Sequence, residues 1–167
     1  MNKEHLYTKQ QYLDMANELS HIPEKYLECI TLLDKVISID PTIIDAYEIK
    51  ANVYATQNED ELVISNYTIA IELANSSELY DTEDLITLYE QRAGYFIHLK
   101  QYEKAISDFT AIYNLDTNNL RAIMYRGFIY EKLGQTTLAT KDIDCVKTYM
   151  EASTGRSIEE LRDILML

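Results

Sequence analysis

The chain has 167 residues and a formal net charge of −13, with 28 acidic and 15 basic residues. This charge disfavours binding to nucleic acid or to anionic membranes, because both present negative phosphate groups. The length is typical of one domain, and only two prolines and four glycines occur, which leaves no obvious linker between domains.

The negative charge is concentrated in the first half of the sequence. Residues 1–85 contain 5 basic and 17 acidic residues, whereas residues 86–167 contain 10 basic and 11 acidic residues. A basic partner for the acidic half, or solubility alone, would account for this asymmetry.

The N-terminal twenty residues predict neither a signal peptide nor a membrane span. Lys3, Glu4 and Lys9 interrupt every apolar run there. The cysteines, Cys29 and Cys145, are far apart and lack the spacing of a metal site, so both are predicted to be small buried side chains. Together these features favour a cytoplasmic, reducing location.

Small and bulky apolar residues recur at a fixed spacing along the chain. Phe96 and Tyr130 are 34 positions apart, as are Ala105 and Ala139. A step of 42 positions separates Ala51 from Ala93, which indicates an insertion of about eight residues within one period. A period of this length predicts stacked copies of one supersecondary unit.

Each period is predicted to contain two helices joined by a short polar turn. In the second period, Tyr47, Ala51 and Tyr54 follow the i, i+4, i+7 spacing of one helix face. Val63, Tyr67 and Ala70 repeat this spacing in the next helix, and the same pattern returns in the later periods. Ala51, Ala93 and Gly127 share one register position, where small side chains allow two helices to cross closely.

These residues resemble the tetratricopeptide-repeat (TPR) family. The matching segments are Arg92-Ala93, Tyr102–Ala105, Arg126-Gly127 and Leu133-Gly134 with Ala139, and Pro41 stands at the family's proline position. The resemblance implies an all-α, helical-hairpin solenoid, a right-handed superhelix of about four helix pairs. It departs from the family pattern at Asn17, which stands at a position for a small residue, and at Thr117, which replaces the proline.

The repeat register divides the chain, taken as a single domain of residues 1–167, into repeats at 10–43, 44–77, 86–119 and 120–153. The insertion at 78–85 is predicted to be a longer loop or a lengthened helix, and a specific contact is the alternative. Ser157 and Glu160 form a capping-box pattern ahead of an apolar stripe, which predicts a capping helix at 157–167. The alternative for that stripe is the surface of a homodimer.

No pattern of catalytic or metal-binding residues is present in the sequence. The three histidines fall in different periods, and there is no Cys-x-x-Cys, His-x-x-x-His or glycine-rich phosphate loop. The sequence therefore predicts a protein that is not an enzyme and has no cofactor and no metal.

In TPR proteins the first helices of successive repeats line a concave groove that accepts a peptide or a helix. The resemblance transfers this partner-binding role to eleven residues, namely Asp14, Glu18, Asp45, Glu48, Ile49, Asn52, Glu90, Gln91, Arg121, Tyr125 and Phe128. The predicted groove is acidic at one end and apolar to basic at the other. It lacks the lysines of the family members that clamp the C-terminal carboxylates of chaperones, so that function is not expected.

The sequence thus favours an adaptor or scaffold that binds a protein or peptide through a basic or amphipathic segment. Ile49, Tyr125 and Phe128 would bury the apolar side chains of that segment. Two alternatives stay open: a small dedicated chaperone for a secreted or assembling client, and a self-assembling structural subunit joined through Leu161, Ile164 and Leu165.

Overall fold

The structure, a computed structural model, describes residues 7–78 and 80–153. In these residues eight α-helices and one short 3₁₀ helix follow one another without a strand, which confirms the all-α prediction. The α-helices are α1 (Lys9–Leu19), α2 (Tyr26–Ile39), α3 (Ile44–Thr56), α4 (Asp60–Ser76), α5 (Thr82–His98), α6 (Tyr102–Leu115), α7 (Leu120–Lys132) and α8 (Thr136–Ser153). The 3₁₀ helix η1 (Pro23–Lys25) precedes α2.

The chain forms two compact units. Unit 1 is Met1–Leu88 and unit 2 is Tyr89–Leu167, so that the division falls within α5. The predicted repeat bounds stay a prediction, and α5 begins inside the segment 78–85 that is expected to be an insertion. The grouping of all residues into a single domain stays a prediction.

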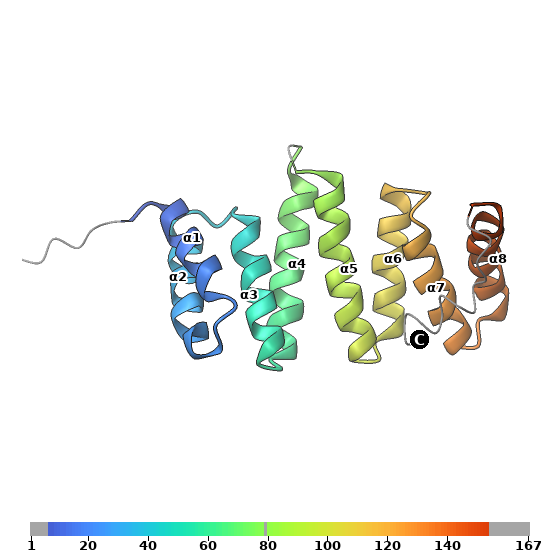
Figure 1. Ribbon diagram of the computed structural model, residues 1–167, viewed down its shortest axis with the longest axis horizontal. Coiled ribbons are helices and arrows are strands. Elements are labelled where there is room, and N and C mark those ends of the chain that lie inside the picture. Colours follow the sequence, from blue (N-terminus) through green and yellow to red (C-terminus); the bar gives the residue numbers. More distant parts are fainter. Residues whose placement is uncertain (1–6, 79, 154–167) are drawn as a thin grey trace, which may run out of the picture. The chain divides into compact units, whose positions relative to one another are not determined.

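In unit 1, α1 packs against α2, α2 against α3, and α3 against α4 (Figure 1). The core between the first three helices contains Leu13, Cys29, Leu33 and Val36, whose spacing places them on the inner faces of their helices. Ala51 is fully buried at the crossing of α3 and α4, at one of the small positions that the sequence predicts.

In unit 2, α7 packs against both α6 and α8 (Figure 1). Gly127 lies where α7 crosses α8, and a Cβ atom added to it would be 3.1 Å from Cβ of Asp142 and from Cγ1 of Ile143. Ala93, at the same register position on α5, is fully buried. The size pattern in the sequence therefore reflects close helix crossings in both units.

In three helix pairs, the turn between the two helices contains one residue in the left-handed conformation. Asn58 has φ of 58°, Lys100 has φ of 57° and Gly134 has φ of 73°. Each of these residues lies two positions after the last residue of the first helix in its pair. A left-handed residue there directs the chain away from the helix axis. Glycine and asparagine accept this conformation readily, whereas lysine does so at a cost.

Side chains at the ends of the helices fix the start of unit 1. Thr8 and Gln11 form a capping box, because the Gln11 N–H donates to Thr8 Oγ1 and the Thr8 N–H donates to Gln11 Oε1. Lys9 and Thr42 both donate to Asp40 in the turn after α2, and these bonds hold the pKa of that carboxyl well below its usual range.

The prediction for the two cysteines is half right. Cys29 is buried, and burial raises the pKa of its thiol to about 11. Cys145 is exposed on α8, so its prediction as a buried side chain is wrong. The predicted capping helix at 157–167, with Leu161, Ile164 and Leu165, lies outside the described residues. Among the helices that are described, none combines the length and the apolar character needed to cross a membrane.

Candidate partner-binding surfaces

The first cavity of unit 1 lies between α1 and α3. It has a volume of about 360 Å³ and draws its walls from the outward faces of the two helices. Its lining residues are Gln10, Leu13, Asp14, Asn17, Asp45, Glu48, Ile49 and Asn52. Five of the predicted binding residues are therefore brought together here: Asp14, Asp45, Glu48, Ile49 and Asn52.

A second cavity, of about 300 Å³, shares Asp45 and Glu48 with the first. Its other lining residues are Tyr80, Asp84 and Thr87, from the loop before α5 and from the first turns of that helix. The two cavities are adjacent, because Asp45 and Glu48 line both of them. We call the surface of unit 1 that lines them the acidic groove, defined by Asp14, Asp45, Glu48 and Asp84.

Among the described residues, no lysine or arginine lines either cavity of the acidic groove. Desolvation raises the pKa of Glu48, and the negative charges of Asp45 and Asp84 raise it further. Desolvation also raises the pKa of Tyr80 to about 12, with added repulsion from Glu48, Asp84 and Asp45. The groove therefore has a negative potential that no basic residue in its lining offsets.

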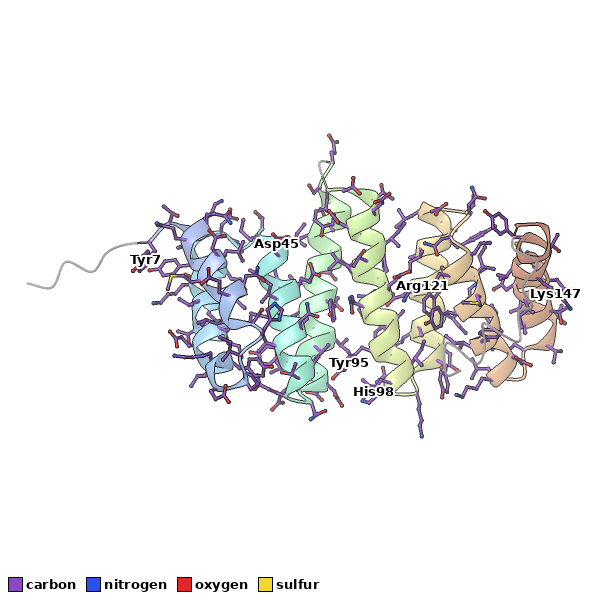
Figure 2. The ribbon with its side chains drawn as sticks, viewed as in Figure 1. Tyr7, Asp45, Tyr95, His98, Arg121 and Lys147 are labelled. Atoms are coloured by element: carbon purple, nitrogen blue, oxygen red, sulfur yellow. The ribbon has the colours of Figure 1, made fainter. Side chains whose placement is uncertain are left out.

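Hydrogen bonds position two of the polar groups in the groove. The Gln10 amide donates to Asp14 Oδ1 at 2.8 Å, which orients the carboxylate one turn along α1. The Tyr67 hydroxyl of α4 donates to Asn52 Oδ1, which orients the Asn52 amide at the edge of the cavity. Asp45, labelled in Figure 2, is exposed at the first turn of α3.

The cavity of unit 2 lies between α5, α6 and α7 and has a volume of about 340 Å³. Its lining residues are Glu90, Gln91, Gly94, Tyr95, Ile97, Phe109, Arg121 and Tyr125. We call it the aromatic pocket, after Tyr95, Phe109 and Tyr125. Four predicted binding residues belong to it: Glu90, Gln91, Arg121 and Tyr125.

The aromatic pocket has a stacked wall and a charged rim. The rings of Phe109 and Tyr125 are 5.3 Å apart between centroids and inclined by 2°. The guanidinium of Arg121 is 5.9 Å from the centroid of Tyr125, and its Nη1 is 3.3 Å from Glu90 Oε2. Tyr95 on α5 and Arg121 on α7 are both labelled in Figure 2.

Two predicted binding residues lie outside these cavities. Glu18 is exposed on α1 but lines neither cavity of unit 1. Phe128 is only 6% exposed and packs with Ile123, Met124 and Val146 in the core of unit 2. Phe128 therefore lies in the core of unit 2 and lines none of these cavities, so its position does not support the expected partner-binding role.

Sequence reasoning did not identify Tyr80, Asp84 and Gly94 as residues of a candidate site. Tyr80 and Asp84 belong to the insertion, where the repeat register gives no position to transfer. Gly94 had a detectable signal, since it is a glycine inside an otherwise regular helical pattern. Within the described residues, no group of three or more His, Cys, Asp or Glu side chains is arranged to hold a metal ion.

Comparisons with known proteins agree with this architecture. No family model matches the chain. Protein unc-45 homolog B of Danio rerio is 28% identical over 120 residues, which is 71% of this chain and 12% of the length of that relative. The chain thus corresponds to a small part of that relative.

Solved structures of helical-repeat proteins superpose over most of the chain. The TPR protein YrrB has a TM-score of 0.66 and 18% identity, covering 89% of this chain and 71% of YrrB. MamA has a TM-score of 0.69 and 18% identity, covering 90% of this chain and 79% of MamA. A tetratricopeptide repeat protein from Parabacteroides merdae has a TM-score of 0.67 and 18% identity, covering 90% and 55%.

These superpositions confirm the resemblance that the repeat pattern indicates. The chain has the tetratricopeptide-repeat fold. At identities of 18%, the comparison defines the fold and leaves the function to be argued from the surfaces of this chain.

Proposed function

We propose that this protein is a protein–protein interaction module that binds a basic, extended or helical segment of a partner in the acidic groove of unit 1. The observation that carries the proposal is the pair of adjacent cavities that share Asp45 and Glu48, whose described lining also includes Asp14 and Asp84 and no lysine or arginine. The proposal assigns binding and no catalysis.

The chemistry of the groove supports a ligand with positive charge and some apolar surface. Opposite charge accelerates encounter and sets orientation, and apolar contact supplies much of the affinity. Leu13 and Ile49 give the floor an apolar strip beside the carboxylates. A segment with lysine or arginine beside aliphatic residues satisfies both parts of this surface.

A similar protein gives independent support for peptide binding by this fold. YrrB is described as a TPR protein with an unusual peptide-binding site. Asn52 and Asp45 would contribute to peptide binding here by different means, the amide through hydrogen bonds to a peptide backbone and the carboxylate through charge. The free cysteines, Cys29 and Cys145, support a reducing, cytoplasmic location as part of the same proposal.

A charge-reversal experiment tests the proposal. The probe is a fluorescent twelve-residue peptide of alternating lysine and leucine, and its counterpart carries glutamate in place of lysine. Fluorescence anisotropy at low salt should show binding of the lysine peptide alone. The double variant Asp45→Lys/Glu48→Lys should weaken that binding by at least about tenfold, since two attractive charges become repulsive.

The matched control changes the net charge equally at a different place. Glu24 and Glu72 are exposed and line neither cavity, so Glu24→Lys/Glu72→Lys alters the overall charge without altering the groove. Equal weakening by both double variants would show general attraction to an acidic protein and would contradict a site in the groove. The milder pair Asp45→Asn/Glu48→Gln checks that any loss is not caused by unfolding.

A further inference from the structure

Neither close packing nor backbone conformation explains why residue 94, inside α5, is a glycine. Gly127 is required by the close crossing of α7 and α8, and Gly134 has a positive φ of 73°. Gly94 has neither reason, because a Cβ atom added to it would meet no atom within 4 Å, and its φ is not positive. Glycine is nevertheless among the least favourable residues inside a helix.

The open space above Gly94 is the interior of the aromatic pocket. Gly94 lines that cavity together with Tyr95 and Ile97 of α5 and with Phe109 and Tyr125 of the neighbouring helices. A glycine at such a place lets a ligand approach the helix backbone closely. Any larger side chain would extend into the cavity and reduce its volume.

We propose that the aromatic pocket of unit 2 binds one aromatic side chain of a partner protein, seated over Gly94 against the wall formed by Phe109 and Tyr125. This inference rests on the proposed interaction function but concerns a different surface and a different chemistry. It assigns specificity for an aromatic residue to this pocket, whereas the acidic groove of unit 1 selects positive charge.

The geometry of the walls favours a flat ring over an aliphatic chain. Phe109 and Tyr125 stack with their planes inclined by 2°, and Phe109 is only 3% exposed, so the accessible aromatic surface of this wall belongs mainly to Tyr125. Aromatic pairs gain attraction beyond that of simple area burial when they stack with an offset or meet edge to face. A further ring placed beside this pair makes such contacts, whereas a leucine side chain makes only apolar ones.

The side chain of Arg121 can move over a bound ring at a low cost in free energy. Its side chain is 63% exposed, and its ion pair with Glu90 is long at 3.3 Å, so that bond is weak and easily rearranged. The guanidinium already lies 5.9 Å from the ring centroid of Tyr125. It can therefore stack on an incoming ring as a cation–π partner, while Glu90 and Gln91 contact the polar backbone beside that ring.

The test uses N-acetyl-L-tryptophanamide, N-acetyl-L-leucinamide and N-acetyl-L-lysinamide as probes of the full chain. Backbone amide signals of Gln91, Gly94 and Ile97 are followed by NMR during titration. The tryptophan amide should give saturable shifts and bind about twofold to tenfold more tightly than the leucine amide. Equal or tighter binding of the leucine or lysine amide, or no shift at these residues with any probe, would overturn the proposal.

Gly94→Leu fills the pocket without disturbing the fold, because the added atoms enter open space. This variant should lose binding of the tryptophan amide while its thermal midpoint rises by about 2–4 °C, since leucine favours a helix more than glycine does. Lys147→Leu on α8 is the matched control, as it adds leucine at an exposed helical position outside the pocket (Figure 2). Unchanged binding by Gly94→Leu would contradict the assignment.

Arg121→Gln tests the cation over the ring. It should weaken binding of the tryptophan amide by about twofold to fivefold and leave binding of the leucine amide unchanged. An equal loss for both amides would contradict a stacking role for the guanidinium.

The two proposals fail separately in these experiments. Binding of the lysine–leucine peptide to the acidic groove should be the same for Gly94→Leu and the unaltered chain. If charge reversal at Asp45 and Glu48 has no effect while the tryptophan amide still binds, the acidic groove is refuted and the aromatic pocket stands.

Discussion

The two units use the same register positions for different electrostatic contacts. In unit 2, Arg92 of α5 holds Asp108 of α6 through two hydrogen bonds of 2.9 and 2.6 Å, and Arg126 of α7 holds Asp142 of α8 in the same way at 2.6 and 2.9 Å. Each ion pair joins the two helices of one pair. The residues of the second ion pair stand 34 positions after those of the first, at the same positions of the repeat.

In unit 1 the corresponding residues are Lys50 and Asn66, and they do not contact each other in this way. Lys50 Nζ binds Asp34 Oδ1 of α2 at 2.6 Å, which links two successive helix pairs. The buried Asn66 amide donates to the Leu62 carbonyl oxygen within α4 instead. An ammonium group lacks the planar fork that lets arginine bind a carboxylate with two parallel bonds.

This difference shows that a repeated backbone does not fix how its polar groups are paired. Arg126 also donates to Thr110 Oγ1 of α6 at 3.3 Å, so it contacts the helix before it and the helix after it. Thr110 stands at the register position of Asp34. At these register positions, unit 2 places its ion pairs within helix pairs, whereas Lys50 of unit 1 links successive helix pairs.

Removal of a buried carboxylate in unit 2 should lower the free energy of unfolding more than any other substitution considered. Asp142→Ala leaves Arg126 without its ion-pair partner, and the two side chains are only 8% and 12% exposed. We expect a loss of about 3–5 kcal/mol in the free energy of unfolding, measured by urea denaturation. The same substitution at Asp34, whose side chain is 58% exposed, should cost about 0–1 kcal/mol.

The double variant Arg126→Met/Asp142→Leu is the control for that prediction. Removal of both charged groups leaves no unpaired ion, so most of the lost stability should return. A double variant as unstable as Asp142→Ala would show that packing rather than charge causes the loss.

The next largest effect concerns the crossing of α7 and α8. Gly127→Leu must displace Asp142 and Ile143, whose atoms are 3.1 Å from the position of an added Cβ. We expect a loss of about 1–3 kcal/mol in the free energy of unfolding. Gly94→Leu adds the same side chain to α5 without a clash, so a similar loss there would contradict the explanation by steric crowding.

Substitutions at the left-handed turn residues should change the free energy of unfolding by about 1 kcal/mol or less. Lys100→Gly should raise the free energy of unfolding by about 0.5–1 kcal/mol, because glycine adopts a φ of 57° without strain. Gly134→Ala should lower it by about 1 kcal/mol, for the opposite reason. Asn58→Gly in unit 1 should change thermal stability least, since asparagine already tolerates this conformation.

The smallest effect is the pH dependence that Glu48 gives to unit 1. Burial and its acidic neighbours raise the pKa of Glu48 above its ordinary value of 4.5, so the folded chain holds this proton more tightly than the unfolded chain does. The contribution to stability is therefore present below pH 4.5 and is lost as the pH rises through the folded pKa. Glu48→Gln should remove this loss and be the more stable protein at neutral pH.

Peptide binding should depend on pH in the opposite direction. A cationic side chain in the acidic groove favours the ionised form of Glu48, so affinity for the lysine–leucine peptide should fall as the pH is lowered through the pKa of that carboxyl. The variant Glu48→Gln should lose part of this dependence. Anisotropy titrations between pH 4 and pH 7 would detect the difference, and identical profiles would contradict the role of Glu48.

The helices and the residues at which they cross could be predicted from local sequence patterns. Periodicity predicts a helix because side chains at i and i+4 share a face, and this relation is local to the chain. The burial of Ala51, Ala93 and Gly127 follows from residue size at a repeated register position.

Which faces of those helices stay accessible depends on tertiary packing and could not be predicted in this way. Phe128 follows Gly127 directly, at the boundary between the core and the groove, and packing against Val146 of α8 commits it to the core. Cys145 precedes Val146 and is left exposed, since no neighbouring helix covers that face in the described structure. Tyr80 in the loop before α5 and Asp84 in the first turn of α5 join the acidic groove, although their segment has no position in the repeat. Burial and cavity lining depend on contacts with residues distant in sequence, which the pattern along one helix cannot predict.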